Sequence, residues 1–142
     1  VMMKCLIGLL TPEEGDIQTE IPESVKECFR FANGFVEECV KNIVKDFYTG
    51  RNIDMAMIEV VLFDHGLLKK RNNHKAFVRA LLDWGILPTD TDIVKLSNGM
   101  ATKLKSPFPE EGYKSWDNCY LNDRRLCIAI GEKLPDSIRY KR

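Results

Sequence analysis

Asp64 and His65 are the neighbouring residues of this chain whose types best suit acid–base chemistry near neutral pH. A carboxylate beside an imidazole can hold and pass a proton, because histidine titrates in that range. Both residues, however, lie at the end of a predicted helix, and adjacent residues on a helix do not face each other. We interpret His65 as a ring that packs at a helix end. The sequence also contains no P-loop, HExxH or GxSxG motif, so we expect no catalytic residue and no enzyme.

Five cysteines could bind a metal or form disulfides, but their number is odd and they are widely spread, at Cys5, Cys28, Cys39, Cys119 and Cys127. No CxxC pair occurs, and neither histidine lies at zinc-ligand spacing from a cysteine. The apolar stretch Met2–Leu10 makes a poor signal peptide, because it contains a lysine and runs into Pro12-Glu13-Glu14. We therefore expect free thiols, a cytoplasmic location, no metal and no cofactor. Cys28 and Cys39 are expected on one face of a single helix.

A basic cluster is the most suggestive group of residues for binding, and it consists of Lys69, Lys70, Arg71, His74, Lys75 and, one turn later, Arg79. Positive charge is unfavourable at a helix N-terminus, but free backbone amides with basic neighbours suit a phosphate group. Three interpretations remain open: a solvated loop, contact with a nucleic-acid backbone, and pairing with an acidic protein surface. The solvated loop is the ordinary expectation for such a run.

Residues 90–105 resemble a helix-turn-helix in outline, with two helical pieces around Ser97-Asn98-Gly99. The second piece carries Lys103 and Lys105, which are weaker candidates for contact with nucleic acid. This piece is short for a recognition helix, because Pro107 ends it. The same sequence also allows one helix to continue through Gly99. A DNA-binding regulator that uses residues 69–79 and 98–105 is therefore the alternative function.

Residues 106–120 are rich in aromatic side chains that lie among lysines, and we expect an irregular loop here. The rings are Phe108, Tyr113, Trp116 and Tyr120. They could stack on single-stranded bases, or they could anchor the loop to the core. We favour anchoring, because a long loop without internal hydrogen bonds needs apolar contacts to hold it down.

The formal net charge is zero, but it is unevenly distributed. Residues 1–66 have a balance of −6 and residues 67–142 a balance of +6. This asymmetry permits an anionic partner at the basic half, and it also permits pairing between the two halves or head-to-tail association. We expect a protein partner or self-association in preference to nucleic acid, and no membrane, since no apolar run approaches the length of a span.

Two similar phrases predict where two helices end. Residues 61–68 read VLFDHGLL and residues 80–87 read ALLDWGIL. In each, an apolar helical stretch meets a glycine and then two aliphatic residues, which is typical of a helix that stops in the left-handed conformation. We expect positive φ angles at Gly66 and Gly85. Residues 53–65 are apolar nearly all round, which predicts a central core helix.

Apolar residues that recur every three or four positions predict the other helices. Residues 22–48 are expected to form one helix along the core helix, and further helices are predicted over about 73–84, 90–104 and 122–134. The fold class is therefore all-α: a single domain, residues 1–142, forming an irregular orthogonal bundle of about five helices. Residues 1–20 form an acidic N-terminal arm and residues 136–142 a basic tail. We expect a small soluble intracellular, non-enzymatic interaction module.

Overall fold

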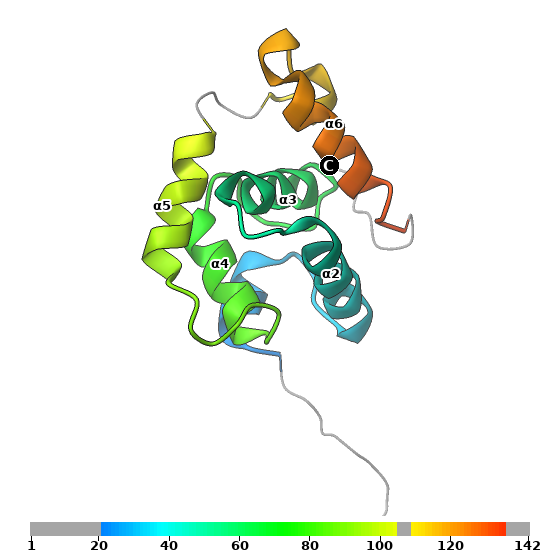
Figure 1. Ribbon diagram of the computed structural model, residues 1–142. Coiled ribbons are helices and arrows are strands. Elements are labelled where there is room, and N and C mark those ends of the chain that lie inside the picture. The colour runs from blue at the N-terminus through cyan, green and yellow to red at the C-terminus, as the bar shows by residue number, and fades with distance from the viewer. Residues whose placement is uncertain (1–20, 105–108, 136–142) are drawn as a thin grey trace, which may run out of the picture.

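Six α-helices follow one another in the described part of the chain, residues 21–104 and 109–135 of a computed structural model (Figure 1). They are α1 (Glu23–Cys28), α2 (Gly34–Phe47), α3 (Asn52–Asp64), α4 (His74–Asp83), α5 (Ile93–Lys103) and α6 (Leu121–Gly131). Two 3₁₀ turns, η1 (Tyr113–Ser115) and η2 (Asn118–Tyr120), precede α6. The expected all-α bundle is confirmed. The N-terminal arm, the basic tail and residues 105–108 lie outside the described residues.

Helix α3 lies at the centre of the bundle, as the sequence predicted (Figure 1). It packs against α2, α4, α5 and α6, and every residue from Asp54 to Leu62 is buried. Asp54 starts the helix by accepting hydrogen bonds from the Thr49 hydroxyl, at 2.6 Å, and from the Arg51 guanidinium, at 2.8 Å. Burial alone would raise the pKa of Asp54, but the hydrogen bonds from Arg51 and Thr49 lower it below its ordinary value.

Gly66 and Gly85 end α3 and α4 in the left-handed conformation, with φ angles of 83° and 79°. The Leu67 amide donates to the Leu62 carbonyl at 2.9 Å, and the Ile86 amide donates to the Leu81 carbonyl at the same distance. These bonds define a Schellman motif at each end. The prediction from the two similar phrases is therefore confirmed.

Gly85→Ala should lower the free energy of unfolding by about 1 kcal/mol, because a Cβ is strained at positive φ. Nothing lies within 4 Å of a Cβ built there, so the strain acts without a clash. Gly34→Ala is the matched control. Gly34 begins α2 with open space around it and no positive φ, so alanine should leave stability unchanged or raise it by up to about 1 kcal/mol. Urea denaturation followed by circular dichroism would measure both, and equal effects would contradict this explanation.

Residues 22–48 do not form one helix, so that prediction was wrong. Helix α1 ends at Cys28, and Phe29 is extended and forms an isolated antiparallel bridge with Leu68. The Arg30 amide donates to the Leu67 carbonyl at 2.9 Å, and the Lys69 amide donates to the Cys28 carbonyl at 3.0 Å. If the helix continued, these backbone groups would form hydrogen bonds within it. They instead form hydrogen bonds with the segment after α3.

Asn33 starts α2 as a separate helix, because its side-chain oxygen accepts a hydrogen bond from the Val36 amide at 2.9 Å. Cys28 therefore lies at the end of α1 and Cys39 lies in α2. The expectation that both share one face of a single helix was wrong for the same reason. These two cysteines and Cys127 are free thiols.

Helix α5 runs without interruption through Ser97 and Gly99, so the two-piece helix-turn-helix was also wrong. Glycine costs about 1 kcal/mol relative to alanine inside a helix. A Cβ at Gly99 would lie only 2.1 Å from the Asn52 amide nitrogen. Gly99 therefore marks a close approach between α5 and α3 and not a turn.

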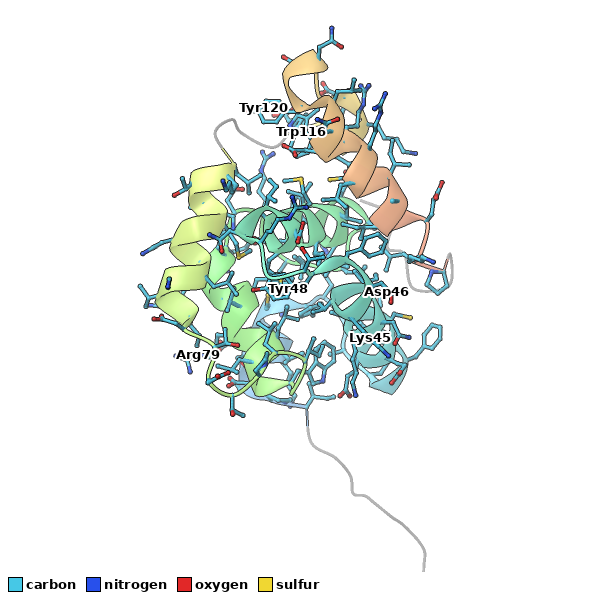
Figure 2. The ribbon with its side chains drawn as sticks, viewed as in Figure 1. Lys45, Asp46, Tyr48, Arg79, Trp116 and Tyr120 are labelled. Carbon is cyan, nitrogen blue, oxygen red and sulfur yellow. The ribbon has the colours of Figure 1, made fainter. Side chains whose placement is uncertain are left out.

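The aromatic segment is anchored to the core, as expected for its described part. Tyr113 and Trp116 are buried, and the Trp116 ring stacks on the Tyr120 ring with centroids 5.2 Å apart (Figure 2). The Arg124 guanidinium donates to the Trp116 carbonyl at 2.9 Å. Phe108 lies outside the described residues. The rings of Tyr113 and Trp116 are consequently not available to stack on bases.

Candidate functional site

A groove between α1 and α4 contains two of the basic residues that the sequence singled out. It encloses a cavity of about 400 Å³, lined by Ser24, Glu27, Lys70, Asn73, Ala76 and Arg79. We refer to these six residues as the α1–α4 groove. They come from α1, from the segment between α3 and α4, and from the outer side of the first two turns of α4. The packing of α1 on α4 brings these three parts of the chain together.

The charges of the groove are mixed. Lys70 and Arg79 are exposed, and neither forms a salt bridge with any residue that the structure describes. Figure 2 shows Arg79 on the outside of α4. Glu27 supplies a carboxylate on the α1 side. Close by, the Ser24 hydroxyl donates to an Asp83 carboxylate oxygen at 2.7 Å. The groove therefore offers two cations for binding while its α1 side carries an anion.

Glu59 is a buried residue of α3 that holds one wall of the groove through hydrogen bonds. This side chain of α3 is 3% exposed, and one of its oxygens accepts a hydrogen bond from the Asn73 amide at 3.2 Å. The other oxygen lies 2.5 Å from Nδ1 of His74. Asn73 and His74 begin α4, which has no side-chain cap from Asn73. Glu59 thus satisfies backbone and side-chain donors at this helix start and fixes the segment that carries Lys70.

A buried carboxyl–imidazole pair such as Glu59–His74 can activate a nucleophile, and Cys28 is the thiol near this pair. Burial, and next the charge of Glu59, raise the pKa of Cys28 to about 12, although Lys69 opposes the change. A thiol with that pKa is protonated at neutral pH and is a poor nucleophile. The pKa of Cys127 is raised as well, chiefly by burial. The Glu59–His74 pair is therefore explained by its role in holding α4.

The residues of the predicted basic cluster differ in their surroundings. Lys69 donates from its ammonium to the Lys26 carbonyl at 2.7 Å. Arg71 lines a separate depression of about 10 Å³ beside Glu59, which is room for about one water molecule. His74 is 12% exposed, and its Nδ1 lies against Glu59, a buried carboxyl group on α3.

The remaining basic residues lie outside the groove. Lys75 is exposed on α4 and does not line the cavity. Lys103 is exposed at the end of α5, and Lys105 lies outside the described residues. Of the candidates that the structure describes, Lys70 and Arg79 line the α1–α4 groove.

Sequence reasoning missed Ser24, Glu27 and Glu59. Nothing near Ser24 or Glu27 in the sequence indicates that they face residues of α4. Glu59 did carry a signal, because it is a lone carboxyl group within an otherwise apolar stretch. Such a residue is buried only when it has a partner, and that reasoning could have predicted a donor opposite it.

Asp64 and His65 lie against different groups of the aromatic segment. His65 is the residue at the C-terminal end of α3, and its Nε2 lies 3.0 Å from the Tyr113 hydroxyl. A Cβ built at Gly112 would lie 2.5 Å from an Asp64 carboxylate oxygen, so Asp64 points toward the backbone of the aromatic segment. His65 is thus the packing ring that we expected.

The described residues contain neither a metal-binding cluster nor a membrane-spanning helix. No three side chains of His, Cys, Asp or Glu converge in a way that would hold a metal ion. No helix in the same part of the chain has the length and the apolar composition needed to cross a membrane. Comparison with known proteins gives no further indication: no protein family, no curated protein and no solved structure matches this chain.

Proposed function

We propose that this chain is a non-enzymatic interaction module that binds an acidic segment of a partner protein in the α1–α4 groove. The observation that carries the proposal is the convergence of two unpaired cations, Lys70 and Arg79, on one cavity. A carboxylate of a partner would pair with either cation. A backbone carbonyl of the same partner would find a hydrogen-bond donor in the Asn73 side-chain amide.

The mixed charge of the groove favours protein over nucleic acid as the partner. A nucleic acid presents phosphates at regular intervals, so affinity requires several of them to be neutralised at once. Glu27 within the groove and Asp83 beside it would repel such a chain. A protein segment can instead place a basic or polar residue opposite Glu27. Lys69, Arg71 and Lys75 do not line the groove, which supports the same choice.

The test is a titration with a fluorescein-labelled oligoglutamate peptide, followed by fluorescence anisotropy at low salt. We expect saturable binding, and we expect the Lys70→Ser/Arg79→Ser variant to raise Kd about fivefold to tenfold, since each exposed charge pair contributes up to about 1 kcal/mol. Because both side chains are exposed, the melting temperature should not change. The Lys41→Ser/Lys45→Ser variant is the matched control: it removes the same charge from α2, where Lys45 is exposed (Figure 2).

Two outcomes would contradict the proposal. The first is equal loss of binding in both double variants, which would indicate an effect of net charge alone. The second is tighter binding to a labelled DNA duplex than to the peptide, with a log–log salt slope of several units, each unit corresponding to about one phosphate contact. That result would favour the alternative, a DNA-binding regulator. Sedimentation of the unmodified protein at the same low salt reveals whether the acidic partner is a second copy of this chain.

A further inference from the structure

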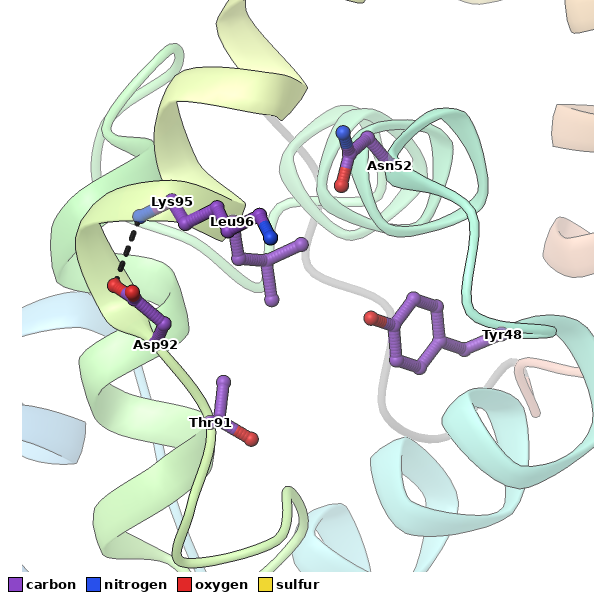
Figure 3. Close-up of a pocket in the computed structure, with 6 residues that line it drawn as sticks. All are labelled: Tyr48, Asn52, Thr91, Asp92, Lys95 and Leu96. Carbon is purple, nitrogen blue, oxygen red and sulfur yellow. Dashed lines mark hydrogen bonds between the residues drawn. The ribbon is translucent and has the colours of Figure 1, made fainter.

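A second cavity lies where the corner between α2 and α3 faces the beginning of α5 (Figure 3). It has a volume of about 240 Å³ and is lined by Tyr48, Asn52, Thr91, Asp92, Lys95 and Leu96. It shares no residue with the α1–α4 groove. Tyr48 follows α2, Asn52 begins α3, and Lys95 and Leu96 lie in the first turn of α5. Since two separate parts of the chain, residues 48–52 and 91–96, form its wall, the cavity depends on the tertiary fold.

The polar side chains of this cavity are largely free to bind. Figure 3 shows the Lys95 ammonium and the Tyr48 hydroxyl directed toward the space between α5 and the α2–α3 corner. Among the residues that the structure describes, the side chains of Tyr48, Asn52, Thr91 and Lys95 have no hydrogen-bond or ion-pair partner. Asp92 differs, because its carboxylate accepts a hydrogen bond from the Lys95 amide at 3.0 Å and starts α5. The groups left over are one cation, two hydroxyls and one amide.

Gly99 provides an independent sign that the wall of this cavity is built into the fold. Its missing side chain leaves the room that the Asn52 amide occupies, because a Cβ there would lie 2.1 Å from the amide nitrogen and 3.0 Å from the amide oxygen. A glycine inside α5 weakens the helix relative to alanine. The contact therefore keeps Asn52 against α5 at the edge of the cavity.

We propose that this cavity binds a small hydroxylated anion, whose charge Lys95 neutralises and whose oxygen atoms accept hydrogen bonds from Tyr48 and Thr91. The Asn52 amide is placed to bind a hydroxyl group of the same molecule, since an amide both donates and accepts. Buried Leu96 supplies an apolar wall for a short carbon skeleton. The volume lies below the usual range for drug-sized ligands, which restricts the molecule to a small metabolite. A hydroxycarboxylate and a phosphate ester share this chemistry.

The experiment is a titration of the ¹⁵N-labelled protein, followed by amide chemical shifts, with two probes that have similar carbon skeletons. Glycerate carries a carboxylate and glycerol 3-phosphate carries a phosphate, while glycerol serves as the uncharged control. We expect saturable shifts confined to amides of residues 48–52 and 91–99 with at least one anion, and none with glycerol. The anion that binds more tightly identifies the class of ligand.

Variants assign the shifts to the cavity. Lys95→Met should weaken binding at least about tenfold, as expected for loss of a charged partner. Lys103→Met, on the same helix but outside the cavity, should not change the affinity. Tyr48→Phe removes one hydroxyl and keeps the ring, so it tests the contact if Lys95→Met impairs folding. Two results would overturn the proposal: no saturable shift with either anion, or the same affinity in the Lys95→Met and Tyr48→Phe variants as in the unmodified protein.

Discussion

Trp84→Ala is expected to lower the free energy of unfolding by about 3–5 kcal/mol, the range for deleting a buried aromatic side chain. Trp84 follows α4 and is 8% exposed. Its ring meets the Phe29 ring edge to face, with centroids 5.2 Å apart and an interplanar angle of 63°. Phe29 in turn lies against Phe77. The substitution would therefore leave a cavity where α4 meets the extended residue between α1 and α2. Urea denaturation followed by circular dichroism at 222 nm measures the change.

Phe35→Ala is the control for this prediction. It also deletes an aromatic ring from a helical protein, but Phe35 is 53% exposed on α2. Substitutions at such positions usually change stability by no more than about 0.5 kcal/mol. If the two variants lost similar amounts of stability, the assignment of Trp84 to the core would be wrong.

Glu59→Ala is expected to have the second largest effect, a loss of about 3 kcal/mol. The substitution leaves the Asn73 amide and Nδ1 of His74 without their acceptor in a place that excludes most water. Each unsatisfied buried donor costs about 1–3 kcal/mol, and breaking a buried pair costs about 3–5 kcal/mol. Thermal and urea denaturation would both show the loss, because α4 and the segment before it lose their attachment to α3.

Glu59→Gln distinguishes lost hydrogen bonds from lost volume. Glutamine keeps the shape of the side chain and one acceptor oxygen, so we expect it to lose less than half as much stability as Glu59→Ala. A glutamine variant as unstable as the alanine variant would mean that both oxygens are required. An alanine variant as stable as the unmodified protein would refute the role assigned to Glu59.

The parts of the fold that sequence predicted are those whose signals are local. Gly66 and Gly85 follow apolar helical stretches directly, and the left-handed conformation that they adopt depends on the residue itself. The burial of α3 follows from apolar residues on all its sides. Both features could be derived without knowing which helix packs where.

The predictions of the fold were wrong at positions whose conformation depends on a residue that is distant in the sequence. Phe29 leaves the helical conformation because its backbone neighbours bind the segment around Leu68, which is remote in the sequence. Gly99 lies inside α5, where the Asn52 side chain occupies the space that a Cβ would need. The spacing of apolar residues within one segment gives no information about such distant partners. It therefore predicted one helix over residues 22–48, where two exist, and allowed a break at Gly99, where none exists.

The candidate groove shows the same limit. Lys70 and Arg79 were identifiable as cations, but their convergence depends on how α1 packs on α4. Ser24 and Glu27 come from a part of the chain that gave no sign of a site. His74 was assigned to the surface because its neighbours are basic, whereas the buried Glu59 determines where it points.

The central position of α3 has a consequence for how the protein is made. Residues 52–64 leave the ribosome before the residues of α4, α5 and α6, the helices that cover much of their surface. At typical rates of synthesis, the residues between the end of α3 and the end of α6 take roughly 3–13 s to be added. Until those helices are added in turn, α3, the most apolar of the described helices, lacks the packing that they provide. The nascent chain therefore exposes the apolar surface of α3, to which chaperones bind, until α6 has been released.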